Sequence, residues 1–344
     1  MQTIWFILVA VMLAGYVLLD GFDLGAGAIH LIAARLDGER RAVLASIGPV
    51  WDGNEVWLLA AGGTLYFAFP PLYAAGFSGF YLALMIVLWL LMLRGMSIEL
   101  RGHVDSPLWR SFWDGTFSVS SILLAVFYGA ALGNVVRGVP LNKDGYFFLP
   151  LWTNLQPGPN PGIIDWYTVL TGVAALLVLT VHGALWVMLR TNGEPEMRSR
   201  RIAMTLYPAV WGIVIAITAA SFAVQPRLWQ SFSARPWECA FPFLAVAGLA
   251  GIRVALSRRA QLAAFLCSCL FIAGLLLSAA FGLYPTLLPA VTGSGMSLTI
   301  GNSSAPAYGL GVGFLWWIPA FLLAAGYTAF IYRHFRGKIS SGTH

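Results

Sequence analysis

The chain has 344 residues, of which 59% are hydrophobic and 10% are charged, and its formal net charge is +6. Soluble globular proteins have about 45–50% apolar and about 25% charged residues, so this composition predicts a polytopic membrane protein. The positive charge does not indicate a nucleic-acid-binding protein, because the basic residues separate apolar spans instead of forming one basic domain.

Runs of about 20 apolar residues, the length that crosses a bilayer as a helix, predict an all-α fold with nine transmembrane helices. The predicted spans are 5–33, 49–69, 72–98, 111–135, 163–189, 201–224, 237–256, 260–282 and 309–333. The first four helices are expected to form one four-helix bundle (1–135) and the next four a second (163–282), with the ninth helix and a tail (309–344) peripheral to both. The connections 136–162 and 283–308 are rich in Pro and Gly and are expected to be irregular loops.

The distribution of positive charge predicts the orientation of these spans. Sixteen of the twenty Lys and Arg residues follow odd-numbered helices, and the other side holds only Arg137, Lys143, Arg227 and Arg235. By the positive-inside rule the N-terminus is periplasmic and the C-terminus is cytoplasmic. Both long loops are then periplasmic.

The first predicted helix carries two acids, Asp20 and Asp23, inside its apolar stretch. A charged group at the centre of a bilayer costs about 2.5–3.5 kcal/mol on insertion scales, so such residues usually face a protein interior or water. Together with His30 they form a polar stripe on one helix face. The stripe fits a proton relay, and it fits equally a structural pair of acids held by an arginine or by backbone donors. Gly21 and Gly25 have the spacing that lets another helix approach closely.

The second predicted helix begins with Asp52 and Glu55 on its cytoplasmic side. Their charge suits the positive end of the helix dipole, which is a purely structural explanation. The neighbouring Trp51 is expected to have a structural role at the membrane interface. In the functional interpretation a proton passes from cytoplasmic water to Asp52 and on toward Asp23, which places Asp20, Asp23, Asp52 and Glu55 on one proton pathway.

Three charged residues near the end of the third predicted helix are candidates for ion pairs: Arg94, Glu99 and Arg101. Arg94 lies deeper in the span and can pair with an acid of the first or second helix, which would hold that carboxylate ionised. Arg101 lies at the interface, where contact with lipid headgroups is expected.

Only two histidines, His30 and His182, fall inside the predicted spans. A haem needs axial ligands such as His, Met or Cys, and a facing pair of intramembrane histidines is typical of a b-type haem. His182 is instead expected to be a hydrogen-bonded core residue, and the three cysteines show no spacing typical of a metal site. The sequence therefore predicts that this chain ligates neither haem nor metal and has no catalytic residue of its own.

Three segments in the first hundred residues resemble subunit II of the cytochrome bd quinol oxidase family, including its cyanide-insensitive branch. They are DGFDLG at 20–25, WDGNEVW at 51–57 and the aromatic and glycine-rich segment 69–81. Weaker similarity continues over almost the whole chain, for example in 133–140 and 285–299.

The resemblance implies a complex of the bacterial inner membrane that oxidises quinol and reduces dioxygen to water. It implies that haems b and d are carried by a partner, subunit I, and that subunit II supports haem assembly without carrying haem. Asp20, Asp23 and Asp52 would lie on a cytoplasmic proton route to subunit I, and Glu55 stands where other members can have Gln. The resemblance leaves open a quinone bound to this chain and a small single-helix subunit.

Two other functions share some of these features. Proton-coupled secondary transporters also have intramembrane acids and glycine-interrupted helices, and a purely structural scaffold is a third alternative. Transporters often have two halves with corresponding broken helices, whereas Asp20 and Asp23 have no counterpart in the second half of this chain. This asymmetry favours the oxidase subunit.

Overall fold

The structure, a computed structural model, describes residues 1–291 and 296–339. The predicted loop 283–308 and the predicted tail therefore each include positions outside the described residues. The long helices are α1 (Gln2–Ala33), α3 (Trp51–Ala68), α5 (Tyr81–Leu100), α6 (Pro107–Arg137), α7 (Trp166–Arg190), α8 (Glu194–Val224), α10 (Ala240–Ser257), α11 (Gln261–Leu283) and α13 (Ala307–His334). The short elements are α2 (Asp37–Ile47), α4 (Pro70–Gly79), α9 (Arg227–Ala234), the 3₁₀-helix η1 (Pro236–Cys239), β1 (Thr286–Leu288), β2 (Leu298–Thr299) and α12 (Ile300–Ser303).

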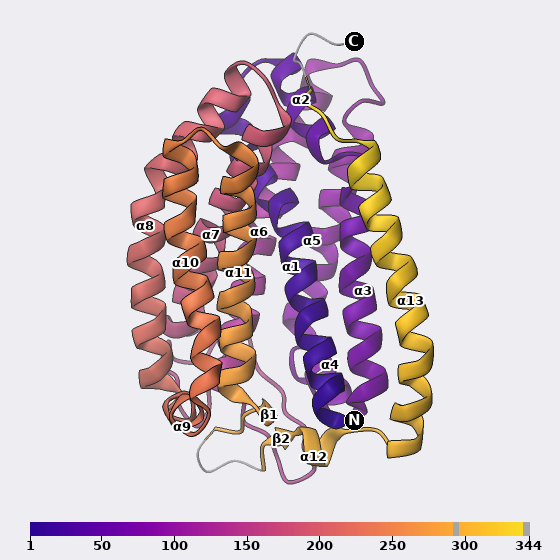
Figure 1. The fold of residues 1–344 in the computed structure, drawn as a ribbon, viewed down its shortest axis with the longest axis vertical. Helices are drawn as coiled ribbons and strands as arrows, with labels where there is room; N and C mark the ends of the chain where they lie inside the picture. The colour runs from indigo at the N-terminus through magenta and orange to yellow at the C-terminus, as the bar shows by residue number, and fades with distance from the viewer. Residues whose placement is uncertain (292–295, 340–344) are drawn as a thin grey trace.

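This arrangement confirms the predicted all-α polytopic membrane protein. Within the described residues, eight helices are long and apolar enough to cross a membrane: α1, α5, α6, α7, α8, α10 together with η1, α11 and α13. The predicted span 49–69 forms α3, which packs along α1 (Figure 1). Its first turns carry Asp52, Asn54 and Glu55, and these polar residues keep α3 from being apolar enough to count among the eight.

Helix α1 occupies the middle of the molecule, in contact with α3, α6, α7 and α11 (Figure 1). The N-terminal end of α1 and the C-terminal end of α13 lie at opposite ends of the long axis. β1, β2, α9 and α12 lie at the end that holds the start of α1, and α2 lies at the other end, which we call the α2 end. The acids of α1 are therefore surrounded by other helices of the same chain.

The predicted helix 72–98 is divided into α4 and α5, which meet at Phe80. The backbone N–H of Leu149, in the loop after α6, donates to the Gly79 carbonyl oxygen over 3.0 Å. The Phe147 ring packs directly on Gly79, where an added Cβ would come within 2.2 Å of it. This contact occupies a carbonyl that a continuous helix would use, so the helix ends and starts again at Tyr81.

Two structured segments lie where the sequence predicts only connections. β1 and β2 pair antiparallel within the predicted loop 283–308. Helix α2 follows α1 and is held by Glu39, whose carboxylate accepts the backbone N–H groups of Arg35 and Leu36 and pairs with Arg198 of α8 at 2.8 Å. Burial raises the pKa of Glu39, but these backbone donors and Arg198 outweigh it, so the pKa lies below its usual range and the carboxylate is ionised at neutral pH.

Gly25 of α1 and Gly183 of α7 form the closest helix contact near the acids. A Cβ on Gly25 would lie 1.9 Å from the Leu179 carbonyl oxygen, and a Cβ on Gly183 would lie 2.2 Å from the Gly25 carbonyl carbon. Neither backbone can yield without separating the helices. The close approach predicted from Gly21 and Gly25 is confirmed.

We predict that Gly183→Val destabilises the assembled protein, because the added side chain forces α1 and α7 apart. Overpacking of this kind costs about 1–3 kcal/mol. The measurement is the thermal unfolding midpoint of the purified protein, with Gly212→Val as the control, since a Cβ on Gly212 of α8 would meet nothing within 4 Å. Equal midpoints for the two variants would contradict the prediction.

Candidate functional site

A fully buried ion pair between Asp20 and Arg94 forms the centre of the candidate site. Arg94 Nη2 of α5 lies 2.6 Å from Asp20 Oδ1 of α1, and both side chains are 0% exposed. Glu55 Oε1 of α3 lies 3.3 Å from the same Arg94 nitrogen. One guanidinium therefore joins three helices.

Two tyrosines extend this pair toward α6. The Tyr16 hydroxyl donates to the second oxygen of Asp20 over 2.8 Å, and it lies 2.9 Å from the Tyr128 hydroxyl of α6. Tyr16 precedes Asp20 by four residues, so the two share a helix face. That spacing was a signal in the sequence that could have identified Tyr16, whereas nothing in the sequence indicated Tyr128.

Asp23, one turn further along α1, has a different set of partners. Asn54 Nδ2 of α3 donates to Asp23 Oδ2 over 2.8 Å and to the Leu19 carbonyl over 3.1 Å. The Asn54 oxygen in turn accepts the Tyr332 hydroxyl of α13 over 2.8 Å. Tyr332 thereby fixes the orientation of the Asn54 amide, with its NH₂ group toward Asp23.

Several buried polar atoms in this region have no hydrogen-bond partner within the described residues. They are Asp23 Oδ1, Arg94 Nε, Arg94 Nη1 and Glu55 Oε1, whose 3.3 Å contact with Arg94 Nη2 is an ion pair without hydrogen-bond geometry. Buried polar groups are normally satisfied by protein or by ordered water. This cluster of acceptors and donors is suited to binding water between Asp23, Glu55 and Arg94.

Asp52 and Trp51 lie at the start of α3, apart from the buried pair. Asp52 is exposed on the surface of this chain. Trp51 is half-buried, and its ring is the nearest group to Gly95 of α5. Asp52 thus lies at the surface, one helical turn from Glu55, which in turn contacts Arg94 of the buried pair.

A second group of charges lies at the α2 end. Asp114 of α6 is buried and accepts from Arg101 over 2.6 Å, from Arg40 over 3.1 Å and from His30 over 2.7 Å. Arg101 is thus buried against carboxylates, where lipid contact was expected from sequence. Glu99 is exposed, and its side chain forms no ion pair within residues 1–291 and 296–339.

Asp37, at the start of α2, completes this group. Burial raises its pKa, but the Arg101 guanidinium at 2.8 Å, together with Arg41 and Arg110, outweighs that effect and holds the pKa below its usual range. The carboxylate is therefore ionised at neutral pH.

His182 is a satisfied core residue, as predicted. Its Nδ1 lies 2.7 Å from Ser268 Oγ, its Nε2 lies 3.0 Å from the Leu18 carbonyl, and its ring stacks on Phe265. Both ring nitrogens thus have hydrogen-bond partners. An axial haem ligand needs one nitrogen free to bind the iron, so His182 is not suited to that role in this arrangement. His30 Nε2 is likewise engaged by Asp114. No group of three or more His, Cys, Asp and Glu side chains suited to a metal occurs in the described part of the chain.

Almost the whole sequence matches a known protein family. The model of the family described as cytochrome bd terminal oxidase subunit II matches residues 1–335. The chain belongs to this family. This membership supports the oxidase interpretation and gives no support to the alternative of a secondary transporter.

Individual members agree with the family assignment over almost their full length. The cytochrome bd-I ubiquinol oxidase subunit 2 of Escherichia coli strain K12 is 33% identical, with 99% of this chain and 95% of the relative aligned. The probable cytochrome oxidase subunit 2 of Haemophilus influenzae is 31% identical, with 99% and 96% aligned. The bd oxidase structure from Geobacillus thermodenitrificans has the same fold, with a TM-score of 0.74, 17% identity and 97% of this chain and 98% of that chain covered.

We predict that Arg94→Leu strongly destabilises the assembled protein, because it leaves Asp20 buried without its cation. Breaking a buried ion pair costs about 3–5 kcal/mol. The double variant Arg94→Leu/Asp20→Asn should recover part of that loss, since neither charge then remains. The measurement is the thermal unfolding midpoint, with the exposed Arg336→Leu as the control. A double variant no more stable than Arg94→Leu would contradict the pairing.

We also predict that Asn54→Leu lowers stability by about 1–3 kcal/mol, because Asp23 loses a donor and the Tyr332 hydroxyl loses an acceptor. Tyr332→Phe should cost less, about 0.5–1.5 kcal/mol, because the Asn54–Asp23 bond remains. Thermal midpoints test both, with Asn192→Leu, an exposed asparagine, as the control. A cost for Tyr332→Phe equal to that for Asn54→Leu would contradict the prediction that the Asn54–Asp23 bond survives the loss of the Tyr332 hydroxyl.

Proposed function

We propose that this chain is the haem-free subunit II of a quinol oxidase that reduces dioxygen to water, and that it conducts protons from the cytoplasm to its partner. Haems b and d, when bound in subunit I, supply the electron transfer and the oxygen chemistry. The support is the family membership, together with relatives whose names specify a ubiquinol oxidase. In this proposal the present chain also supports haem assembly in subunit I, in the bacterial inner membrane.

The detailed topology is part of the same proposal. We place nine crossings in the membrane by adding α3 to the eight apolar helices, and we put the α2 end in the cytoplasm because most of the arginines flank it. Residues 1–135 and 163–282 are then two four-helix bundles with α13 peripheral. A bound quinone and a small single-helix subunit are compatible with this arrangement.

One observation supports the proton-conducting role most strongly. The buried site contains more carboxyl groups than cations. Asp20 and Glu55 both contact one cation, Arg94, whereas Asp23, three residues after Asp20 on α1, has the neutral Asn54 amide as its donor. A low-dielectric site cannot hold two uncompensated carboxylates ionised at once, so protons must balance the excess. The site therefore stores protons that can exchange between neighbouring oxygens.

The order of the residues suggests the direction of transfer. Asp52 is exposed, Glu55 lies one turn further along α3 and touches Arg94, and Asp20 and Asp23 follow on α1. Water held by the unpartnered atoms of Asp23, Glu55 and Arg94 can connect these carboxylates. A proton entering at Asp52 thus reaches the middle of the membrane without an isolated charge crossing it.

The exposed faces of α5 and α13 provide a surface for the partner. None of the residues in the most apolar stretch of α13 and only 17% of those in α5 are buried in this chain. Leu59 of α3, Trp89 of α5 and Leu323 of α13 are each at least 60% exposed. We assign this surface to contact with subunit I, so that Asp52 lies at the edge of the interface.

We predict that Asp23→Asn and Asp52→Asn each lower quinol-driven oxygen consumption at least about tenfold, because an amide cannot pass on a proton as a carboxylate does. Proton uptake from the α2 side in proteoliposomes should fall in parallel. The haem absorption spectrum should stay unchanged, which separates slow turnover from failed assembly.

Asp144→Asn, an exposed acid in the loop after α6, is the matched control and should behave as the unmodified protein. Normal turnover and normal proton uptake in both Asp23→Asn and Asp52→Asn, with normal haem content, would contradict the conducting role. A purified chain that carries no larger haem-containing polypeptide with it in mild detergent would contradict the proposed partner.

A further inference from the structure

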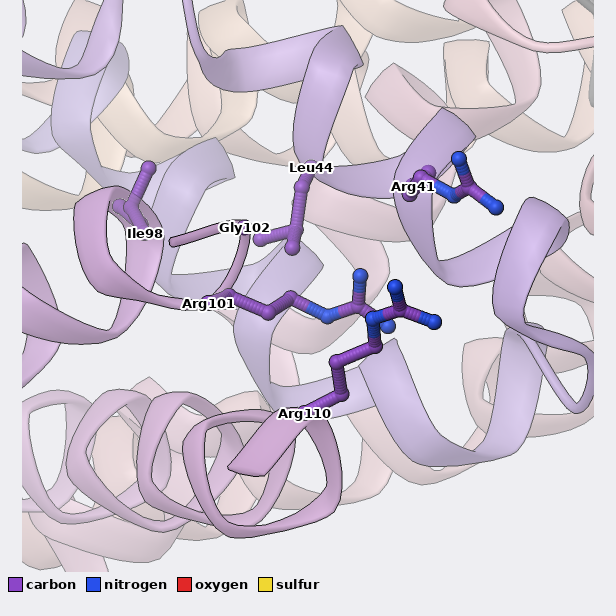
Figure 2. Close-up of a pocket in the computed structure, with 6 residues that line it drawn as sticks. All are labelled: Arg41, Leu44, Ile98, Arg101, Gly102 and Arg110. Carbon is purple, nitrogen blue, oxygen red and sulfur yellow. The ribbon is translucent and has the colours of Figure 1, made fainter. Parts of the chain in front are cut away.

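An arginine-lined pocket at the α2 end lies outside the buried site. Its cavity of about 350 Å³ is lined by Arg41, Leu44, Ile98, Arg101, Gly102 and Arg110. In Figure 2 the three guanidinium groups lie toward one side, with Ile98 on the other and Leu44 between them. The pocket brings together α2, the end of α5 and the start of α6.

The three arginines share one carboxylate. Asp37 Oδ1 lies 2.8 Å from Arg101, whereas Asp37 Oδ2 lies 2.8 Å from Arg41 and 3.6 Å from Arg110. The last distance exceeds that of a hydrogen bond. Asp105, the other acid paired with Arg110, has a side chain that is 92% exposed, so water screens that contact.

The positive charges and N–H donors of these arginines therefore outnumber the negative charges and acceptor oxygens of the nearby acids. Counting Arg40 and Asp114 behind the pocket, four guanidinium groups face three carboxylates in the described structure. Each guanidinium has five N–H donors, and Arg41 and Arg110 are 64% and 31% exposed, so their free donors are accessible. An added anion with several oxygens would satisfy them.

Exposed apolar side chains near the pocket support a position at the depth of lipid headgroups. Leu108 and Phe112, in the first turns of α6 on either side of Arg110, are 81% and 59% exposed. Val104, in the preceding turn, is 45% exposed. Such apolar side chains on a membrane protein are suited to hydrocarbon, whereas arginines at the same level meet headgroups.

The pocket itself has the same two-sided character. Leu44 and Ile98 provide an apolar wall beside the arginines. A Cβ on Gly102 would meet no atom within 4 Å, so there is free space beside this lining residue. A ligand with an anionic phosphate and an apolar tail matches both walls.

We propose that this pocket binds the phosphate group of an anionic phospholipid of the adjoining leaflet. Arg41 and Arg110 contact the phosphate oxygens, Arg101 stays on Asp37 and Asp114, and the glycerol and acyl chains run along Leu44 and Ile98. Because α2, α5 and α6 all contribute to the pocket, the bound lipid ties these three elements together. A soluble phosphate shares the anionic group but would leave the apolar wall unused.

The test uses the delipidated, purified oxidase complex in neutral detergent, titrated separately with dioleoylphosphatidylglycerol, dioleoylphosphatidylcholine and inorganic phosphate. The readout is the thermal unfolding midpoint as a function of ligand concentration. Phosphatidylglycerol should raise the midpoint in a saturable manner. The double variant Arg41→Gln/Arg110→Gln should need about 30-fold more phosphatidylglycerol for half of the maximal shift, since two basic contacts to an anionic lipid are lost.

Arg258→Gln/Arg259→Gln, two exposed arginines in the turn between α10 and α11, is the matched control and should respond as the unmodified protein. The lipid assignment is overturned if inorganic phosphate protects as well as phosphatidylglycerol, or if phosphatidylcholine does so. The site itself is overturned if Arg41→Gln/Arg110→Gln responds to phosphatidylglycerol like the control. The double variant keeps Arg101 with Asp37 and Asp114, so the fold should remain intact, and its midpoint without lipid checks this.

Discussion

The ion pair between Arg94 and Asp20 is the interaction on which the rest of this structure depends. Both side chains are fully buried, in a helix bundle that lies in a membrane. Neither charge is tolerable there alone, so α5 and α1 must keep the register that brings Arg94 to Asp20. Glu55 then approaches the same guanidinium from α3, and Tyr16 occupies the second oxygen of Asp20. The same cluster of atoms thus braces the helices and, in the proposed function, is also the place where protons are stored.

The two groups of charges along α1 differ in a way that fits different roles. Around Asp114 at the α2 end, several cations surround the acid, which favours fixed ion pairs and a stable surface at that end. Around Arg94 the acids outnumber the cation, which favours exchangeable protons. In the proposed account, the ratio of acids to cations distinguishes a structural cluster from one that can conduct protons, because both clusters contain acids.

Much of the fold and part of the candidate site could be predicted from the sequence. Apolar runs predicted the helices, and Gly25 correctly indicated a close helix contact. Arg94 was recognised as a partner for a buried acid because it lies deep in its span. Asn54 and Tyr332 were missed because polar residues of ordinary types acquire a role only when α3 and α13 meet. The division between α4 and α5 was also missed, since the group that ends α4 comes from a distant loop.

The most direct test of the proton-conducting account is an experimental structure of the assembled oxidase at a resolution that shows ordered water. The account predicts Asp52 at the contact with the haem-carrying subunit, and water molecules that connect it past Glu55 and Arg94 to Asp23. Asp52 and Glu55 facing lipid, with no water beside Asp23 Oδ1 or Arg94 Nε, would contradict it.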